Sequence, residues 1–305
     1  MTIAYISHPD CLLHEIGDNH PERPARLHAI QDQLIRSGLE FVLIPCEAPL
    51  IEREHLERVH DPQYVAGLFK QAPDHGFLAL DDDTIMMSGT LTAARRAAGA
   101  VLRGIELVLD EGFSTAFCAV RPPGHHAENA RAMGFCFFNN IAVGAAYALE
   151  VKGLERVAIV DFDAHHGNGT EDIFHNDPRV LFCSSFQSPF YPFTGDEIAS
   201  EHIVNVTLPA ATSGEQFREQ IETHWLPALH DFQPQLLLIS AGFDAHMEDD
   251  MAQLNFRDSD FAWITSRLKE IADQYADGRI VSALEGGYNL DALGRSVALH
   301  LDALL

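Results

Sequence analysis

Residues 156–169, RVAIVDFDAHHGNG, decide the fold class of this 305-residue chain. Their first part, Arg156–Val160, is an almost continuous apolar run, which is typical of a strand buried on both faces of a parallel sheet. The polar residues begin where that strand ends, and ligands of open parallel sheets bind beyond the carboxyl ends of the strands. The stretch therefore predicts a parallel α/β fold with a site at this edge of the sheet.

Short apolar runs of this kind alternate with longer amphipathic stretches along the whole chain. The expected strands are Ile3–Ser7, Phe41–Ile44, Thr115–Val120, Arg156–Val160, Val180–Ser184, Ile203–Val206, Leu236–Ser240 and Arg279–Leu284. Long helices are expected at Leu91–Leu109, after a capping box at Ser213 and Gln216, and at Asp258–Tyr275. We therefore expect a single-domain, doubly wound parallel sheet over residues 1–305, with long loops at the carboxyl ends of the strands.

The composition is that of a globular protein, with 47% hydrophobic and 21% charged residues. No apolar run approaches the ~18 residues that span a bilayer, and Met1–Tyr5 does not resemble the start of a signal peptide. The five cysteines are scattered and form no CxxC pair, which favours free thiols in a reducing compartment. These features predict a cytoplasmic protein that does not enter a membrane.

The charge is strongly negative, because 45 Asp and Glu residues face 20 Lys and Arg residues, a formal net charge of −25. Such a surface repels nucleic acid and anionic membranes and favours cationic partners. Solubility alone also accounts for most of these charges. We expect no nucleic-acid partner, and the sequence leaves the oligomeric state open.

Three other expected strands also run into polar clusters. These clusters are Arg121–His126 (RPPGHH), Ala241–Asp244 (AGFD) and Glu285–Asn289 (EGGYN). One such cluster could be a capped turn. Because the carboxyl ends of parallel strands meet at one edge of the sheet, four clusters there indicate a functional site.

The spacing of Asp161, Asp163 and His165 predicts a metal site. Residues two apart in an extended segment point to the same side, so Asp163 and His165 could reach one ion, with Asp161 deeper. Asp244 is the natural third ligand, since an unpaired carboxylate after an apolar strand would be costly. Helix capping or pairing with arginine is the alternative for any one of these acids, but three acids and a histidine together favour a metal.

The tandem His125 and His126 lie in a loop that two prolines and a glycine make rigid, which suits general acid–base residues. Asp161 could orient His125, whereas the corresponding support for His126 would be the neutral Asn168. Tyr288 follows two glycines and could stabilise a developing oxyanion, although a Gly-Gly-Tyr segment alone is more often a turn with a packed ring.

Together these segments resemble the histone deacetylase superfamily, whose motifs occur here in family order over roughly residues 1–300. The matching motifs are Arg121–Ala127 (RPPGHHA), Gly134–Asn139 (GFCFFN), Asp161–Gly169 (DFDAHHGNG), Ala241–Ala245 (AGFDA) and Glu285–Asn289 (EGGYN). His20–Pro24 (HPERP) and Asn168 resemble the class II branch with its bacterial members. The resemblance implies an arginase–deacetylase fold, although 305 residues are few for this branch and imply short rim loops.

The resemblance also implies the roles of individual residues. One zinc ion, or Fe²⁺ or Co²⁺, would be bound by Asp163, His165 and Asp244, and a structural K⁺ would lie near Asp161, His165 and Ser184. In catalysis, His126 would act as the general base and then as the general acid, and His125 would assist electrostatically. Asp161 would support His125, and Tyr288 would polarise the substrate carbonyl. Substrate would meet Gly134, Phe135, Tyr191 in place of the family's phenylalanine, Met251, and Asp83 or a neighbour in 81–83. Asn168 and Arg23 would support the site.

The position seven after Asp244 bears on the substrate. It holds Met251, whereas acetylpolyamine-selective relatives carry Glu there, so the sequence favours removal of acetyl groups from lysine side chains of proteins or peptides. Deacetylation of small acetylated amines, including polyamines, is the alternative within the same chemistry. Two further hypotheses are a non-catalytic acyl-lysine binding module, which the complete catalytic set argues against, and a binuclear arginase-like hydrolase, which would need more metal ligands.

Overall fold

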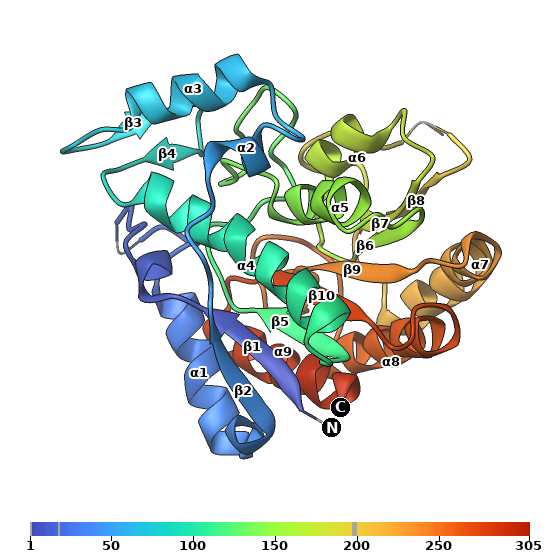
Figure 1. The fold of residues 1–305 in the computed structure, drawn as a ribbon. Helices are drawn as coiled ribbons and strands as arrows, with labels where there is room; N and C mark the ends of the chain where they lie inside the picture. The colour runs from blue at the N-terminus through green and yellow to red at the C-terminus, as the bar shows by residue number, and fades with distance from the viewer. Residues whose placement is uncertain (1, 18, 197–199) are drawn as a thin grey trace.

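An eight-stranded sheet forms the centre of the molecule (Figure 1). The structure is a computed structural model and describes residues 2–17, 19–196 and 200–305. The strands of this sheet are β1 (Ile3–Ser7), β2 (Leu43–Glu47), β5 (Thr115–Cys118), β6 (Val157–Asp161), β7 (Val180–Gln187), β8 (Ile203–Leu208), β9 (Leu236–Ala241) and β10 (Ile280–Leu284). Their order is β2-β1-β5-β10-β9-β6-β7-β8, and all neighbouring pairs are parallel. The expected parallel sheet is thus confirmed.

Helices cover both faces of the sheet (Figure 1). One layer contains α4 (Thr90–Asp110), α5 (Asn140–Glu150) and α6 (Asn168–Phe174), with α2 (Arg53–Leu56) and α3 (Pro62–Gln71) packed beyond them. The other contains α1 (Ala25–Ser37), α7 (Gly214–Phe232), α8 (Asp258–Tyr275) and α9 (Leu290–Leu304). The helices of each layer pack against one face of the sheet in a hydrophobic cluster of their own, so the strands are buried on both faces. Smaller elements are β3 (Leu78–Ala79) and β4 (Ile85–Met86), which pair antiparallel, and the 3₁₀ helices η1 (Pro9–Leu12) and η2 (Leu39–Val42).

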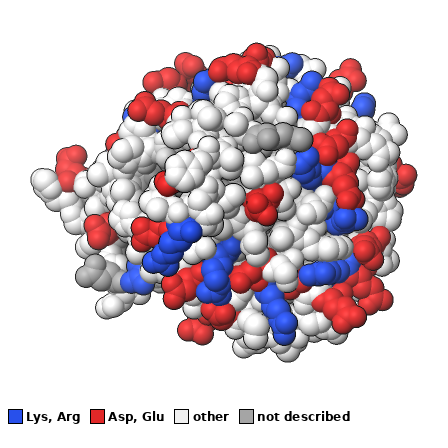
Figure 2. Space-filling view, turned by 90° about the horizontal axis from the view of Figure 1, so that it is seen from below, with Lys and Arg blue, Asp and Glu red and all other residues white. Residues whose placement is uncertain are grey.

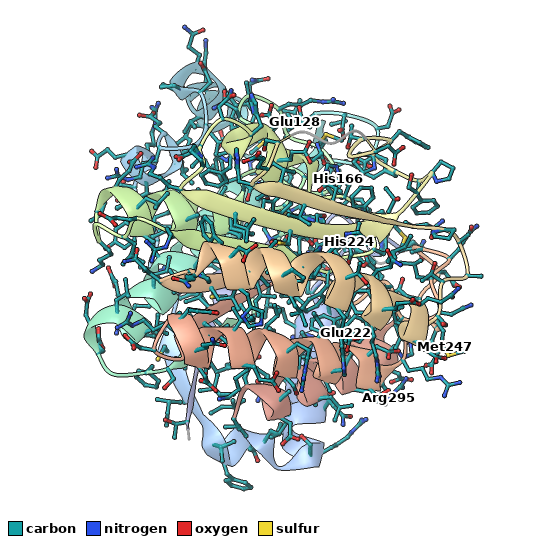
Figure 3. The ribbon with its side chains drawn as sticks, turned by 90° about the vertical axis from the view of Figure 1, so that its right-hand side faces the viewer. Glu128, His166, Glu222, His224, Met247 and Arg295 are labelled. Atoms are coloured by element: carbon teal, nitrogen blue, oxygen red, sulfur yellow. The ribbon has the colours of Figure 1, made fainter. Side chains whose placement is uncertain are left out.

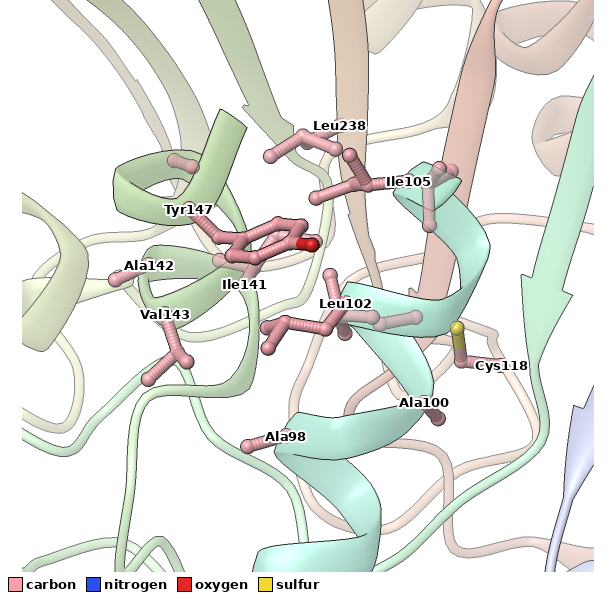
Figure 4. Close-up of a cluster of buried hydrophobic side chains, with 14 of the residues drawn as sticks. Ala98, Ala100, Leu102, Ile105, Cys118, Ile141, Ala142, Val143, Tyr147 and Leu238 are labelled. Atoms are coloured by element: carbon pink, nitrogen blue, oxygen red, sulfur yellow. The ribbon is translucent and has the colours of Figure 1, made fainter. Parts of the chain in front are cut away.

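Small residues let α4 and α5 approach each other closely. Leu102 and Ile105 of α4 share one buried cluster with Ile141 of α5 (Figure 4). A Cβ atom on Gly144 of α5 would overlap Val101 of α4, so glycine is required at this crossing. Burying each large aliphatic side chain in such a cluster contributes about 1.5–3 kcal/mol, which holds this layer on the sheet.

The three predicted helices are present. Helix α8 has the bounds Asp258–Tyr275, and the capping box of Ser213 and Gln216 begins α7. The side chains of Glu222 and His224 lie on the exposed face of α7, away from the sheet (Figure 3).

The strand expected at Phe41–Ile44 is present but begins two residues later than predicted. Leu39–Val42 form the 3₁₀ helix η2, and the strand β2 begins only at Leu43, because the Phe41 side chain is 85% exposed and joins no core. The strand β1 has the predicted bounds, and the remaining strands begin or end one to three residues from theirs, as at β5, which stops at Cys118.

Acidic and basic side chains are interspersed over the face of the molecule that Figure 2 shows. The net charge of −25 is therefore not gathered into a separate acidic region on that face. Within the described residues, no helix is long and apolar enough to cross a membrane.

Candidate active site

The four strands that end in polar clusters are consecutive neighbours in the sheet. They are β5, β10, β9 and β6, and their carboxyl ends open at one edge. The loop after each strand carries its cluster to this edge, so residues from four distant parts of the chain meet there. This is the convergence that the sequence predicts.

Asp163, His165 and Asp244 lie together at the centre of this edge. Each offers one ligand atom, these atoms lie within 4.8 Å of one another, and all three residues are buried. The Nδ1 atom of His165 is 3.1 Å from Asp163 Oδ1 and 3.0 Å from Asp244 Oδ2. The remaining carboxylate oxygens are fixed by backbone N–H groups, because Gly286 donates to Asp163 Oδ2 at 2.8 Å and Ala164 donates to Asp244 Oδ1 at 2.8 Å.

Two glycines make room for these carboxylates. A Cβ atom on Gly242 would collide with the carboxylate of Asp163. A Cβ atom on Gly286 would collide with Asp244 Oδ2 and come close to Asp163 Oδ2. The backbone of two different loops thus forms a cradle that only glycine allows around this pair of acids.

The charges of this cluster suit a divalent cation. Burial and the neighbouring Asp163 raise the pKa of Asp244 to about 6. Burial also opposes ionisation of Asp163, but His125 and His165 outweigh it and hold the pKa of Asp163 well below its usual range. Two buried carboxylates and one imidazole are a donor set that zinc and related divalent ions accept, and a cation there would offset the repulsion between the acids.

The two tandem histidines have different partners. His125 Nδ1 lies 2.9 Å from Asp161 Oδ2, and its Nε2 lies 3.8 Å from Asp163 Oδ2. Burial lowers the pKa of His125, but Asp161 and Asp163 outweigh burial and raise it to about 10. The pKa of His126 moves the other way, well below its usual value, because burial and the neighbouring His125 and His165 oppose a positive charge.

A narrow cavity of about 180 Å³ leads to this cluster. It is lined by Asp83, His126, Gly134, Phe135, His165, Phe190, Tyr191, Met251 and Tyr288. Gly134 and Phe135 both have positive φ, at 57° and 67°, and a Cβ on Gly134 would overlap the ring of His126. The Phe135 ring lies 5.9 Å from that of Tyr288, and the Tyr191 ring lies 5.4 Å from that of His126.

The structure places every predicted substrate-contact residue in the wall of this cavity. Among residues 81–83, Asp83 is the one that lines it, while its Oδ1 accepts the N–H of Gly134 at 3.2 Å. Asp81 instead accepts the N–H groups of Asp83 and Thr84. Arg23 lies outside this cavity and lines a second hollow, which adjoins it at Met251 and Tyr288.

Several residues of the site were not predicted from the sequence. Phe190 stacks on His165 with ring centroids 5.6 Å apart. The buried Arg26 lies under Tyr288, with its guanidinium carbon 4.8 Å from the ring centre. It donates to the carbonyl of Gly287 at 2.6 Å and to that of Glu285 at 2.5 Å. A signal was present in the arginine-rich segment that starts at His20, but nothing local shows which arginine turns inward.

Behind the loops that form this site lies a buried set of charges. Glu22 accepts two hydrogen bonds from Arg121, at 2.7 and 2.6 Å. Burial raises the pKa of Glu22, but Arg121, His14 and Arg26 outweigh burial and lower it to about 2. The Glu285 carboxylate accepts the N–H groups of Gly124 and His125 at 2.6 and 3.1 Å. These contacts fix the loop that carries both histidines.

Comparison with known proteins gives the same assignment as the site. The chain matches the histone deacetylase domain family over residues 20–304. It is 38% identical over 302 residues to a probable deacetylase of Archaeoglobus fulgidus, covering 95% of this chain and 82% of that protein. It is 35% identical over 327 residues to the polyamine deacetylase HDAC10 of Homo sapiens, covering 100% of this chain and 48% of that protein. The solved HDA15 HD domain superposes with a TM-score of 0.91 at 30% identity, covering 100% of this chain and 90% of that one.

The chain therefore belongs to the histone deacetylase family, and it is a deacetylase of that family. The arginase-like fold that the motifs implied is confirmed by the match to the HDA15 HD domain.

Proposed function

We propose that this chain is a metal-dependent amidohydrolase that removes acetyl groups from lysine side chains of proteins or peptides. The observation that carries the proposal is the cavity lined by His126, Tyr288 and His165, the last of which belongs to the Asp163–His165–Asp244 cluster. The three residues of that cluster would hold one divalent ion, which we expect to be zinc. Such an ion supplies Lewis-acid polarisation of the amide carbonyl and lowers the pKa of water.

His126 is the proposed general base. Its pKa lies well below the usual value, so the imidazole is neutral at pH 7 and can accept a proton from the attacking water. The same nitrogen then returns the proton to the leaving amine. His125, whose pKa is raised to about 10 by Asp161 and Asp163 against the effect of burial, stays cationic and favours negative charge that develops beside it.

Tyr288 is proposed to stabilise the oxyanion. Burial holds the pKa of its phenol well above the usual value, so the hydroxyl stays protonated and can donate a hydrogen bond. Its ring is confined between Arg26 and Phe135, which limits the positions that the hydroxyl can take.

The cavity favours a thin aliphatic chain. Phe135, Tyr191 and Met251 offer apolar surface along a volume of about 180 Å³, which suits the methylene stem of an acylated lysine. The second candidate is a small acetylated amine such as an acetylpolyamine. The 35% identity to a polyamine deacetylase over the whole chain favours it, and Met251 in place of Glu argues against it.

A structural K⁺ is proposed beside the catalytic loops. Ser184 pairs with Asp161 across β7 and β6, and its Oγ atom is buried without a hydrogen-bond partner. An unsatisfied buried hydroxyl next to a carboxylate is the environment that a bound cation would satisfy. We also propose a cytoplasmic location, because all five cysteines are free thiols.

Purified protein should be assayed for acetate release from acetyl-lysine peptides, longer acyl-lysine peptides and acetylpolyamines, each with and without chelator. We expect the acetyl-lysine peptides to be hydrolysed with the highest kcat/KM, and chelator to abolish the reaction. Binding of acetyl-lysine peptide without hydrolysis would instead indicate a binding module. Higher kcat/KM for acetylpolyamines would select the second candidate.

A further inference from the structure

Asp249 is a buried carboxylate that holds the backbone next to Tyr288. Its side chain is nine-tenths buried or more, since the residue is 5% exposed. Asp249 Oδ2 accepts the N–H of Tyr288 at 2.6 Å and the N–H of Asn289 at 2.8 Å. The other oxygen, Oδ1, accepts the N–H of Met251 at 3.0 Å in a local turn. Among the ion pairs of the described residues, none joins Asp249 to a Lys, Arg or His side chain.

This contact completes the clamp on the Tyr288 loop. Arg26 holds the carbonyls of Glu285 and Gly287 on one side, and Asp249 holds the two following N–H groups on the other. These N–H groups directly precede α9, so the positive end of the helix dipole also favours the carboxylate. Tyr288 therefore cannot shift along the chain direction without breaking charge-assisted hydrogen bonds on both sides.

The loop that carries Asp249 is itself anchored to α9. Asn289 Nδ2 donates to the carbonyl of Glu248 at 2.7 Å, and Arg295 pairs with the Glu248 carboxylate at 3.0 Å. Figure 3 shows Met247 of this loop and Arg295 of α9 at the same end of the molecule. These contacts fix the position of Asp249 relative to Tyr288.

We propose that Asp249 is a positioning residue for the hydrolysis, which holds the Tyr288 hydroxyl at the reacting carbonyl by fixing the Tyr288 backbone N–H. The inference rests on the proposed function, in which Tyr288 stabilises the oxyanion. A displacement of about 1 Å in such a group is enough to cost up to about a hundredfold in rate.

Only a carboxylate satisfies all three N–H groups. An asparagine has a single acceptor oxygen, so its amide N–H₂ would face either the N–H of Met251 or those of Tyr288 and Asn289. Asp249→Asn keeps the shape of the side chain but makes one of these contacts repulsive. Asp250→Asn is the matched control, because Asp250 is the next acid in the chain and is exposed. This substitution removes the same charge as Asp249→Asn.

The experiment compares wild type, Asp249→Asn and Asp250→Asn by kcat, KM, metal content and Tm with an acetyl-lysine peptide. We expect kcat of Asp249→Asn to fall about tenfold or more at unchanged metal content, with KM within about twofold of wild type, and Asp250→Asn to match wild type. Unchanged kcat in Asp249→Asn overturns the proposal. If wild type itself releases no acetate, the proposed function fails, which is a different result.

A double-mutant cycle with Tyr288→Phe separates positioning from a general structural defect. If Asp249 acts through the Tyr288 hydroxyl, Asp249→Asn lowers kcat by less than about twofold in the Tyr288→Phe background. A full additive loss in that background contradicts the proposal. Asp249→Ser, which is smaller and introduces no clash, goes through the same cycle if Asp249→Asn does not fold, with the same two outcomes.

Discussion

The Nδ1 atom of His126 lies 2.7 Å from the Oδ1 atom of Asn168. The amide of Asn168 is oriented by a second contact, because its Nδ2 donates to the Glu128 carboxylate at 2.8 Å. The amide oxygen only accepts, so His126 Nδ1 carries the hydrogen and Nε2 keeps the lone pair. A neutral partner thus fixes the tautomer of His126, whose pKa stays well below its usual value because burial and the neighbouring histidines oppose a positive charge, whereas the carboxylate of Asp161 behind His125 raises the pKa of that residue.

Asn168→Asp replaces the neutral partner of His126 by a carboxylate. An opposite charge at this distance raises the pKa of a histidine by about one unit or more. Because the base must be neutral, the acidic limb of kcat/KM against pH should move upward by a similar amount, and activity below that limb should fall. The exposed Asn176→Asp is the control for the added charge. An acidic limb at its wild-type pH would show that His126 is not the base.

Gly286→Ala tests the cradle around the two carboxylates. The added Cβ would displace the side chains of Asp244 and Asp163, so we expect metal affinity to fall about 10–100-fold. Gly67→Ala is the matched control, since its Cβ would make only an ordinary contact on α3 and helix propensity favours alanine. Competition with a metal-binding dye measures the metal affinity of both variants. Equal affinity in Gly286→Ala and wild type would mean that the ion is held elsewhere.

The sequence predicted the sheet edge better than the details around it. Continuous apolar runs ending in polar clusters located β5, β6, β9 and β10, because both properties are local. The strand at Phe41–Ile44 was misplaced because an apolar run of four residues does not distinguish a strand from a 3₁₀ turn.

Met251→Glu tests the choice between lysine and polyamine substrates. A carboxylate in the cavity wall could pair with the second amine of an acetylpolyamine, which is worth roughly 1.5–3 kcal/mol in a partly desolvated site. The ratio of kcat/KM for acetylpolyamine over acetyl-lysine peptide should therefore rise about ten- to a hundredfold. Met247→Glu, on an exposed side chain of the same loop, is the control. An unchanged ratio would remove the main argument that the substrate is an acetylated lysine rather than an acetylpolyamine.

Glu22→Gln tests the buried charges behind the catalytic loops. The folded pKa of Glu22, about 2, lies below its ordinary value of 4.5, so its contribution is present above about pH 4.5 and is lost as the pH falls toward 2. That contribution is about 3 kcal/mol of unfolding free energy. Urea unfolding should show Glu22→Gln to be less stable at pH 7, with the gap to wild type narrowing below pH 4.5. A gap independent of pH, or an equal loss in the exposed Glu54→Gln, would contradict this account.

The residues that the sequence did not reveal depend on long-range contacts. Arg26 reaches the Tyr288 loop from a helix far earlier in the chain, and its hydrogen bonds to Glu285 and Gly287 span 259 and 261 positions. Phe190 stacks on His165 from a loop that carries no motif. Spacing arguments apply within one strand or helix, so they identified Asp163 and His165 together but not these partners.

The most direct test of the account is a metal titration of the chelated protein, with acetate release from an acetyl-lysine peptide as the readout. We predict no activity before addition of Zn²⁺, a linear rise, and a break at one ion per chain. Asp244→Ala should bind no ion tightly and show no such rise. Full activity in the chelated protein, or a break at two ions per chain, would contradict the assignment of a single metal site to Asp163, His165 and Asp244.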